Sequence, residues 1–102
     1  MVCFVVAQLN IHDPEGYEKY RLAFRKLFPN YDAKILAVDD APTVVEGEWP
    51  YRRFALLEFR DREEAQRWYN SPEYQAASRD LRWPAVSGTI LFVEGRVGSA
   101  GE

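Results

Sequence analysis

The sequence contains one cysteine and one histidine among its 102 residues. A single cysteine excludes an intramolecular disulfide, and a single histidine excludes a metal site built from several histidines. Because Cys3 lies in an apolar segment, we expect it to be a small buried hydrophobe, and no Ser-His-Asp or Cys-His catalytic group can be assembled around His12. No glycine-rich phosphate loop is present either. The sequence therefore predicts no metal and no cofactor.

An excess of positive charge is also missing, since the formal net charge is −3 and the arginines are interspersed with acids. Nucleic-acid binding requires a positive surface, so nucleic acid is not an expected partner. No apolar run reaches the length that spans a bilayer, and the N-terminus lacks the basic and apolar segments of a signal peptide. We expect a cytoplasmic protein without a membrane partner.

What the chain does have is the composition of a globular protein, with 47% hydrophobic and 15% aromatic residues. Its length suits a single domain, which we place at residues 1–97, and the small and polar residues 98–102 predict a frayed tail. A chain of this length buries only about 60–65% of its unfolded surface, so association with a second copy would add stability.

Four strands are predicted from β-branched and aromatic runs, at Val2–Leu9, Tyr31–Val38, Arg53–Arg60 and Val86–Glu94. The first and third of these are apolar on both faces, apart from one polar residue in each, which are Gln8 and Glu58. After the second strand, a turn precedes a short extended arm at Thr43–Glu46.

Helix-capping residues predict three helices. Asp13 caps a helix that starts at Pro14 and runs to about Phe28. Asp61 caps a second helix that stops at Asn70. Ser71 and Pro72 start a third, which presents Tyr74, Ala77 and Leu81 on one side and ends at Trp83-Pro84.

The order strand, helix, strand, strand, helix, strand predicts an α+β, ferredoxin-like βαββαβ subunit with a four-stranded antiparallel sheet. Right-handed crossovers place all helices on one face of that sheet. The central strands are apolar on both faces, so the uncovered face needs a partner. We expect a homodimer through the sheet face, and the alternative is a monomer with an open ligand cleft.

Several strings resemble one bacterial family. They are Val45-Glu46-Gly47-Glu48-Trp49, Leu56-Leu57-Glu58-Phe59, the run from Ala65 to Gln75 with its Trp-Tyr-Asn-Ser-Pro-Glu-Tyr-Gln core, Leu81-Arg82 and Val93-Glu94-Gly95. They are similar to domain of unknown function 1330 in the dimeric α/β barrel superfamily. The resemblance implies a ferredoxin-like subunit and a dimer whose sheets meet as a barrel. It implies no established reaction, and the superfamily includes cofactor-free monooxygenases, isomerases and haem-binding enzymes.

Glu58 is the candidate catalytic residue, because a carboxylate in an apolar strand would have a raised pKa and would serve as a general base. Gln8, expected at the matching position of a parallel neighbouring strand, would orient a substrate beside it. The alternative interpretation is structural, with Glu58 paired to an arginine or in contact with water at the dimer seam.

The helix aromatics are candidate ligand-binding residues, although their spacing also suits core packing. They are Tyr17, Tyr20, Trp68, Tyr69 and Tyr74. Arg79 and Arg82 would bind a carboxylate at the mouth of such a pocket or form surface salt bridges. His12 is either an exposed loop residue or a haem ligand.

Two functions follow from these residues. In the first, a homodimer binds or transforms a small apolar or aromatic metabolite in a pocket beside the sheet, with Glu58, Gln8 and the helix tyrosines as polar points. In the second, the chain is a non-catalytic dimeric assembly domain. The sequence leaves open whether the protein is an enzyme.

Overall fold

The computed structural model describes residues 1–95, so the tail predicted at 98–102 lies outside the described residues. The elements are β1 (Cys3–Ile11), α1 (Pro14–Leu27), η1 (Phe28–Asn30), β2 (Ala33–Asp39), β3 (Arg53–Phe59), α2 (Arg62–Tyr69), α3 (Pro72–Ala77), η2 (Ser78–Arg82), α4 (Trp83–Ala85) and β4 (Val86–Glu94). Four strands and the helices between them match the predicted order.

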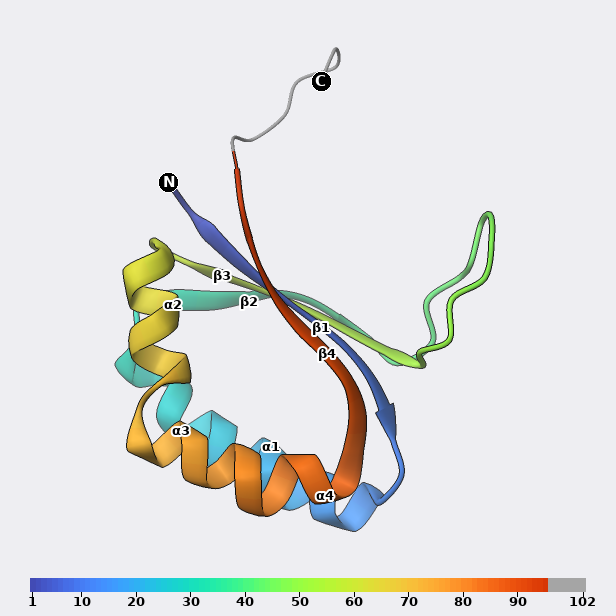
Figure 1. Ribbon diagram of the computed structural model, residues 1–102, viewed down its shortest axis with the longest axis horizontal. Coiled ribbons are helices and arrows are strands. Elements are labelled where there is room, and N and C mark those ends of the chain that lie inside the picture. Colours follow the sequence, from blue (N-terminus) through green and yellow to red (C-terminus); the bar gives the residue numbers. More distant parts are fainter. Residues whose placement is uncertain (96–102) are drawn as a thin grey trace.

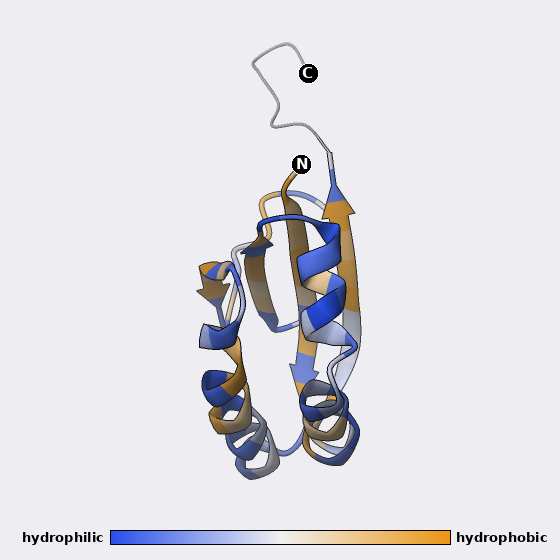
Figure 2. Ribbon diagram, turned by 90° about the vertical axis from the view of Figure 1, so that its left-hand side faces the viewer, coloured by the Kyte–Doolittle hydropathy of each residue, from blue (hydrophilic) through white to orange (hydrophobic). Residues whose placement is uncertain are grey.

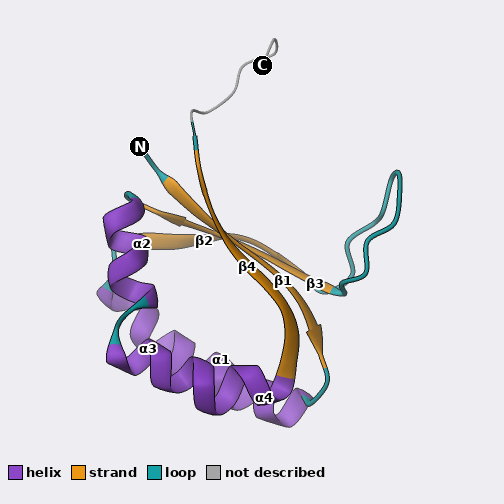
Figure 3. Ribbon diagram, in the orientation of Figure 1, coloured by secondary structure: helices purple, strands orange, loops and turns teal. Residues whose placement is uncertain are grey.

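The strands form one antiparallel sheet in the order β2-β3-β1-β4. The helices lie along one face of this curved sheet, and the other face carries none (Figures 1 and 3). The predicted ferredoxin-like α+β fold is therefore confirmed. None of the helices within residues 1–95 has the length and apolar character needed to cross a lipid bilayer.

Each main helix begins at a capping residue that the sequence identifies. The side chains of Asp13, Asp61 and Ser71 accept hydrogen bonds from backbone N–H groups three residues later, at 3.2, 2.9 and 3.1 Å. Proline occupies the first position of α1 and α3, where its missing N–H costs nothing. These local signals explain why the predicted helix starts agree with the structure.

The third helix departs from the prediction beyond Ala77. Instead of one regular helix, the chain widens into the π-helix η2, where the Trp83 N–H donates to the Ser78 carbonyl. In a regular α-helix the ring of Pro84 would collide with the carbonyl of Asp80, and widening the preceding turn relieves this conflict. The wider turn brings Arg82 inward, where it is only 2% exposed, and Leu81 remains partly buried against the core as expected.

The segment 40–52 between β2 and β3 also differs from the prediction. The extended arm expected at Thr43–Glu46 contains no strand. The segment instead projects away from the helices (Figure 1), and Val45 on it is 94% exposed.

The main hydrophobic core lies between the helices and the sheet. The strands are predominantly hydrophobic, whereas the helices alternate between hydrophobic and hydrophilic residues (Figure 2). Cys3 is fully buried in this core, which confirms its prediction as a small buried hydrophobe. Burial raises the pKa of its thiol.

Candidate functional site

A cavity of about 80 Å³ lies inside this core, between the sheet and the helices. It is lined by Val5, Ala7, Leu9, Tyr17, Tyr20, Arg21, Phe24, Arg53, Ala55, Leu57, Trp68, Tyr74, Arg82 and Ile90. The lining therefore joins three strands to α1, α2, α3 and η2, which is the position expected for a pocket beside the sheet.

Small side chains on the sheet explain why this part of the core is not filled. Ala7 on β1 lies opposite Ala55 on β3 and opposite Ile90 on β4. Larger residues flank both alanines along the same face, such as Val5, Leu9 and Leu57. Two methyl groups thus form a depression in the sheet where neighbouring positions carry larger side chains, and the helices above it do not fill the space.

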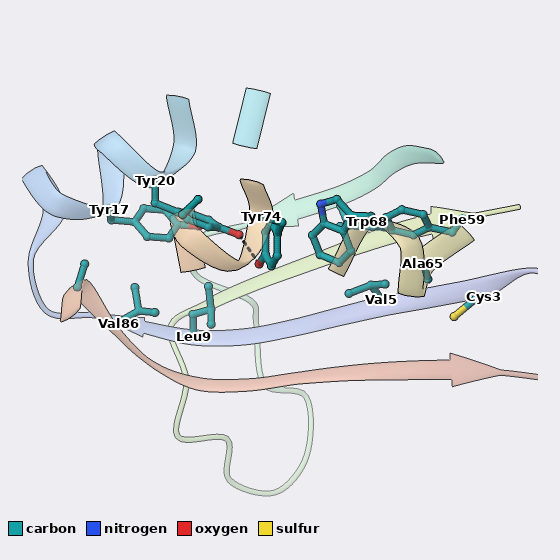
Figure 4. Close-up of a cluster of buried hydrophobic side chains, with 13 residues drawn as sticks. Cys3, Val5, Leu9, Tyr17, Tyr20, Phe59, Ala65, Trp68, Tyr74 and Val86 are labelled. Atoms are coloured by element: carbon teal, nitrogen blue, oxygen red, sulfur yellow. Dashed lines mark hydrogen bonds between the residues drawn. The ribbon is translucent and has the colours of Figure 1, made fainter. Parts of the chain in front are cut away.

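Aromatic side chains form the helix side of the cavity. Tyr17 and Tyr20 come from α1, Trp68 from α2 and Tyr74 from α3. The hydroxyls of Tyr20 and Tyr74 point toward one another and lie 2.8 Å apart (Figure 4). Burial raises the pKa of both phenols, so both are neutral at pH 7.

Three buried polar atoms in residues 1–95 lack a hydrogen-bond partner, namely Arg53 Nε, Trp68 Nε1 and Arg82 Nε. All three belong to side chains that line the cavity. Each is an N–H donor, and leaving such a group unpaired in the interior is costly. The cavity is therefore mostly apolar, and three of the side chains around it carry an unsatisfied donor.

Arg53, which is partly buried, and Arg82, which is buried, have different surroundings. Arg53, at the start of β3, forms an ion pair with the exposed carboxylate of Asp40, and its guanidinium lies 5.3 Å from the ring centroid of Tyr17. Arg82 donates a 2.6 Å hydrogen bond to the hydroxyl of Ser78. No carboxylate in residues 1–95 forms an ion pair with Arg82, which is a buried cation with neutral neighbours.

A larger surface hollow of about 400 Å³ adjoins the cavity. The two spaces share the lining residues Tyr17, Arg21 and Arg53. The outer hollow also includes Glu18, Asp40 and other polar side chains. This arrangement provides a polar mouth at the end of the cavity where Arg53 lies.

Glu58 and Gln8 lie on the other face of the sheet and do not line this cavity. Glu58 forms a 3.2 Å ion pair with Lys34, so its partner is a lysine and not the arginine considered in the structural interpretation. The expected placement of Gln8 beside Glu58 is wrong, because β1 and β3 are antiparallel. Glu58 pairs with Phe4, whereas Gln8 pairs with Phe54 four residues away.

Some of the other predicted site residues line the cavity and others do not. Tyr17, Tyr20, Trp68, Tyr74 and Arg82 line the cavity, whereas Tyr69 does not. Arg79 is exposed and pairs with Asp80. His12 is exposed, and its Nε2 lies 2.8 Å from the hydroxyl of Ser87.

Sequence analysis did not identify Arg53 or the alanines Ala7 and Ala55 as site residues. The alanines did carry a signal, because each is the smallest side chain in a strand of large apolar residues. No sequence signal distinguished Arg53 from the other arginines of the chain.

The titratable side chains of the cavity are tyrosines and arginines, and no carboxylate or histidine lines it within residues 1–95. A protein side chain that would accept a proton at neutral pH is therefore missing from its walls. The same residues contain no cluster of three or more metal-ligating side chains. The arrangement suits binding and orientation of a small ligand with a hydrogen-bond acceptor.

The sequence model of the family described as Domain of unknown function (DUF1330) matches residues 2–96. No curated protein matches this chain in sequence.

Solved structures share the fold at low identity. A protein of unknown function from Rhodopseudomonas palustris has a TM-score of 0.75 at 11% identity, over 95% of this chain and 84% of that one. SnoaB, a cofactor-independent oxygenase from Streptomyces nogalater, has a TM-score of 0.63 at 12% identity, over 97% of each chain. A dimeric ferredoxin-like protein of unknown function from Thermobifida fusca has a TM-score of 0.60 at 15% identity, over 91% of this chain and 90% of that one.

Proposed function

The chain belongs to the DUF1330 family, and we propose that it is a cytoplasmic homodimer that binds a small apolar or aromatic metabolite in the cavity between the sheet and the helices. One observation carries the proposal. The buried side-chain donors that lack partners in residues 1–95 all belong to residues around the same apolar space. A ligand with an acceptor group and an apolar body would satisfy both features.

Core packing alone accounts less well for this geometry. A core that serves only stability is filled at high density, and its polar atoms are paired. Here the alanine pair leaves space, and Trp68 Nε1 and Arg82 Nε remain unpaired beside it. SnoaB shows that a similar fold holds an oxygenase, but the absence of a carboxylate or histidine from these walls favours binding over a general-base reaction.

A thermal-shift panel of small aromatic acids, phenols and quinones tests the binding site. At a ligand concentration of 100 times Kd, a bound compound adds about 2.7 kcal/mol of stability, and Tm rises by several degrees. Ala55→Leu places three more carbons in the cavity, so we expect it to abolish the shift without lowering the Tm of the free protein. Ala7→Leu serves the same purpose if Ala55→Leu does not fold.

Glu58→Gln is the matched control, because Glu58 lies on the far face of the sheet. It should retain the full ligand-induced shift. If no compound raises the Tm of the wild type, or if Ala55→Leu responds as the wild type does, the cavity is not the binding site.

The face of the sheet without helices supports the homodimer. Its central row pairs Leu56 with Val6 and Val6 with Leu91, and Leu91 is 47% exposed. The neighbouring row on one side contains the Lys34–Glu58 ion pair. In the neighbouring row on the other side, the hydroxyl of Thr89 donates to Gln8 at 3.2 Å.

An apolar centre flanked by polar groups is the usual anatomy of a protein interface. A second copy of the chain is the proposed occupant, as in the dimeric ferredoxin-like protein from Thermobifida fusca. The same exposed face is what favours the second candidate function, a dimeric assembly domain in which the cavity has no ligand.

A further inference from the structure

The environment of Arg82 indicates the charge of the ligand, which the shape of the cavity does not. Arg82 is the last residue of the π-helix η2. Its side chain lines the cavity and is 2% exposed. A guanidinium is protonated in all ordinary conditions, so Arg82 carries a full positive charge inside the core.

Every identified neighbour of this charge in residues 1–95 is neutral. Arg82 donates to the Ser78 hydroxyl, and its guanidinium carbon lies 4.4 Å from the ring centroid of Trp83. The nearby Tyr74 is also neutral, because burial raises the pKa of its hydroxyl. A buried cation without a carboxylate partner is unfavourable, and proteins rarely retain one without a compensating anion.

Arg53 differs from Arg82 in that its charge is compensated. It already has a carboxylate partner in Asp40, which is largely exposed at the mouth. The inner arginine is therefore the one whose charge is not compensated, and its Nε–H has no acceptor.

We infer that the cavity binds a small aromatic carboxylate, whose carboxylate pairs with Arg82 and whose ring lies among the aliphatic and aromatic side chains. This inference rests on the proposed ligand site and adds the chemical class of the ligand. A guanidinium matches a carboxylate because two parallel N–H groups meet two oxygens, and the free Nε–H of Arg82 offers one of them.

The depth of Arg82 also sets the orientation of the ligand. The mouth of the cavity lies beside Arg21 and Arg53, whereas Arg82 is fully enclosed. The carboxylate enters first, past the two mouth arginines, and the rest of the ligand follows it. The cavity volume of about 80 Å³ limits the enclosed part to about one small ring.

The test compares benzoate with benzamide, which has nearly the same shape and no charge, by isothermal titration calorimetry. Wild-type protein should bind benzoate at least about tenfold more tightly than benzamide. Arg82→Met removes the inner charge and should weaken benzoate binding by at least about tenfold, while it changes benzamide binding by less than about threefold.

Arg79→Met is the matched control. Arg79 lies on the same π-helix and the substitution removes the same charge, but the side chain is exposed and paired with Asp80. The preference for benzoate should persist in Arg79→Met. If Arg82→Met does not fold, Arg82→Gln replaces it, and the wild-type ratio still decides whether the site prefers an anion.

The outcomes separate this inference from the proposed function. Equal binding of benzoate and benzamide by the wild type overturns the carboxylate assignment and leaves the ligand site intact. A benzoate preference that persists in Arg82→Met shows that Arg82 is not the carboxylate receptor. If the wild type binds neither probe nor any compound of the panel, both the inference and the proposed function are wrong.

Discussion

The hydroxyl oxygens of Tyr20 and Tyr74 lie 2.8 Å apart in the buried wall of the cavity, although 54 residues separate them in the chain. This hydrogen bond joins α1 to α3 over the sheet. Because both phenols are neutral, one hydroxyl donates and the other accepts. The pair fixes the position of the aromatic wall that a ligand would contact.

Removing both hydroxyls of this pair should cost less stability than the sum of the two single removals. Tyr74→Phe leaves the Tyr20 hydroxyl buried without its partner, and we expect a loss of about 1–2 kcal/mol in the free energy of unfolding. Tyr20→Phe should cost a similar amount. The double substitution removes both hydroxyls, so its cost should fall below the sum by about 1 kcal/mol. Urea unfolding of the four proteins measures this coupling, and strictly additive losses would contradict it.

The stability of the protein should depend on pH through Glu64. Its carboxylate is buried and accepts hydrogen bonds from Arg67 and from the backbone N–H of Asp32, each at 2.8 Å. These contacts, those with Arg67 first, lower its pKa from 4.5 to about 2.

The depressed pKa makes the ionised form favourable to folding, so the contribution is complete above about pH 4.5 and is lost as the pH falls from 4.5 to 2. Glu64→Gln should therefore destabilise the protein by roughly 2 kcal/mol at pH 7 and by much less near pH 2. Urea unfolding at both pH values measures the difference. A penalty that is the same at both would show that ionised Glu64 does not stabilise the fold.

Gly88 in β4 should not tolerate any side chain. Its φ angle is +149°, and a Cβ atom there would lie 2.0 Å from the carbonyl oxygen of Gln8. Gly88→Ala should lower the free energy of unfolding by at least about 3 kcal/mol, because the contact is with backbone that cannot move without opening the pairing of β1 and β4. Gly95→Ala is the control, since a Cβ there meets nothing within 4 Å. Equal effects in thermal unfolding would contradict the close approach.

The proposed dimer predicts a position-specific effect of charge. Leu91→Glu introduces a carboxylate at the centre of the open sheet face and should convert the protein to a monomer at micromolar concentration. Leu22→Glu, on α1, alters a side chain of similar exposure, 51% against 47%, and should leave the dimer intact. Sedimentation velocity distinguishes the two. A wild-type monomer at that concentration would contradict the homodimer itself.

Local signals in the sequence were enough to predict most of the fold. Asp13, Asp61 and Ser71 mark the helix starts, and the β-branched and aromatic runs mark the four strands. The strand order and the placement of the helices follow from the connectivity. These features depend on neighbouring residues, which is why they can be read without coordinates.

The site was less predictable because it depends on register. The sequence placed Gln8 beside Glu58, but antiparallel pairing of β1 and β3 separates them by four residues. It placed Leu81 on the inward side of the third helix, where Leu81 does pack against the core, but it did not show that the π-helix also buries Arg82. Shifts of this kind decide which side chain reaches a cavity, and helical periodicity alone does not reveal them.

The indole N–H of Trp68 tests the central proposal most directly. Trp68 lines the cavity and its Nε1 is an unpaired donor, whereas Trp49 and Trp83 are not among the lining residues. In ¹H–¹⁵N spectra of the uniformly labelled protein, the three indole resonances are resolved and assigned with Trp68→Phe. Titration with benzoate should shift the Trp68 indole resonance saturably and leave the other two nearly unchanged. A Trp68 resonance that stays in place while the protein binds benzoate or another compound of the panel would contradict a ligand site between the helices and the sheet.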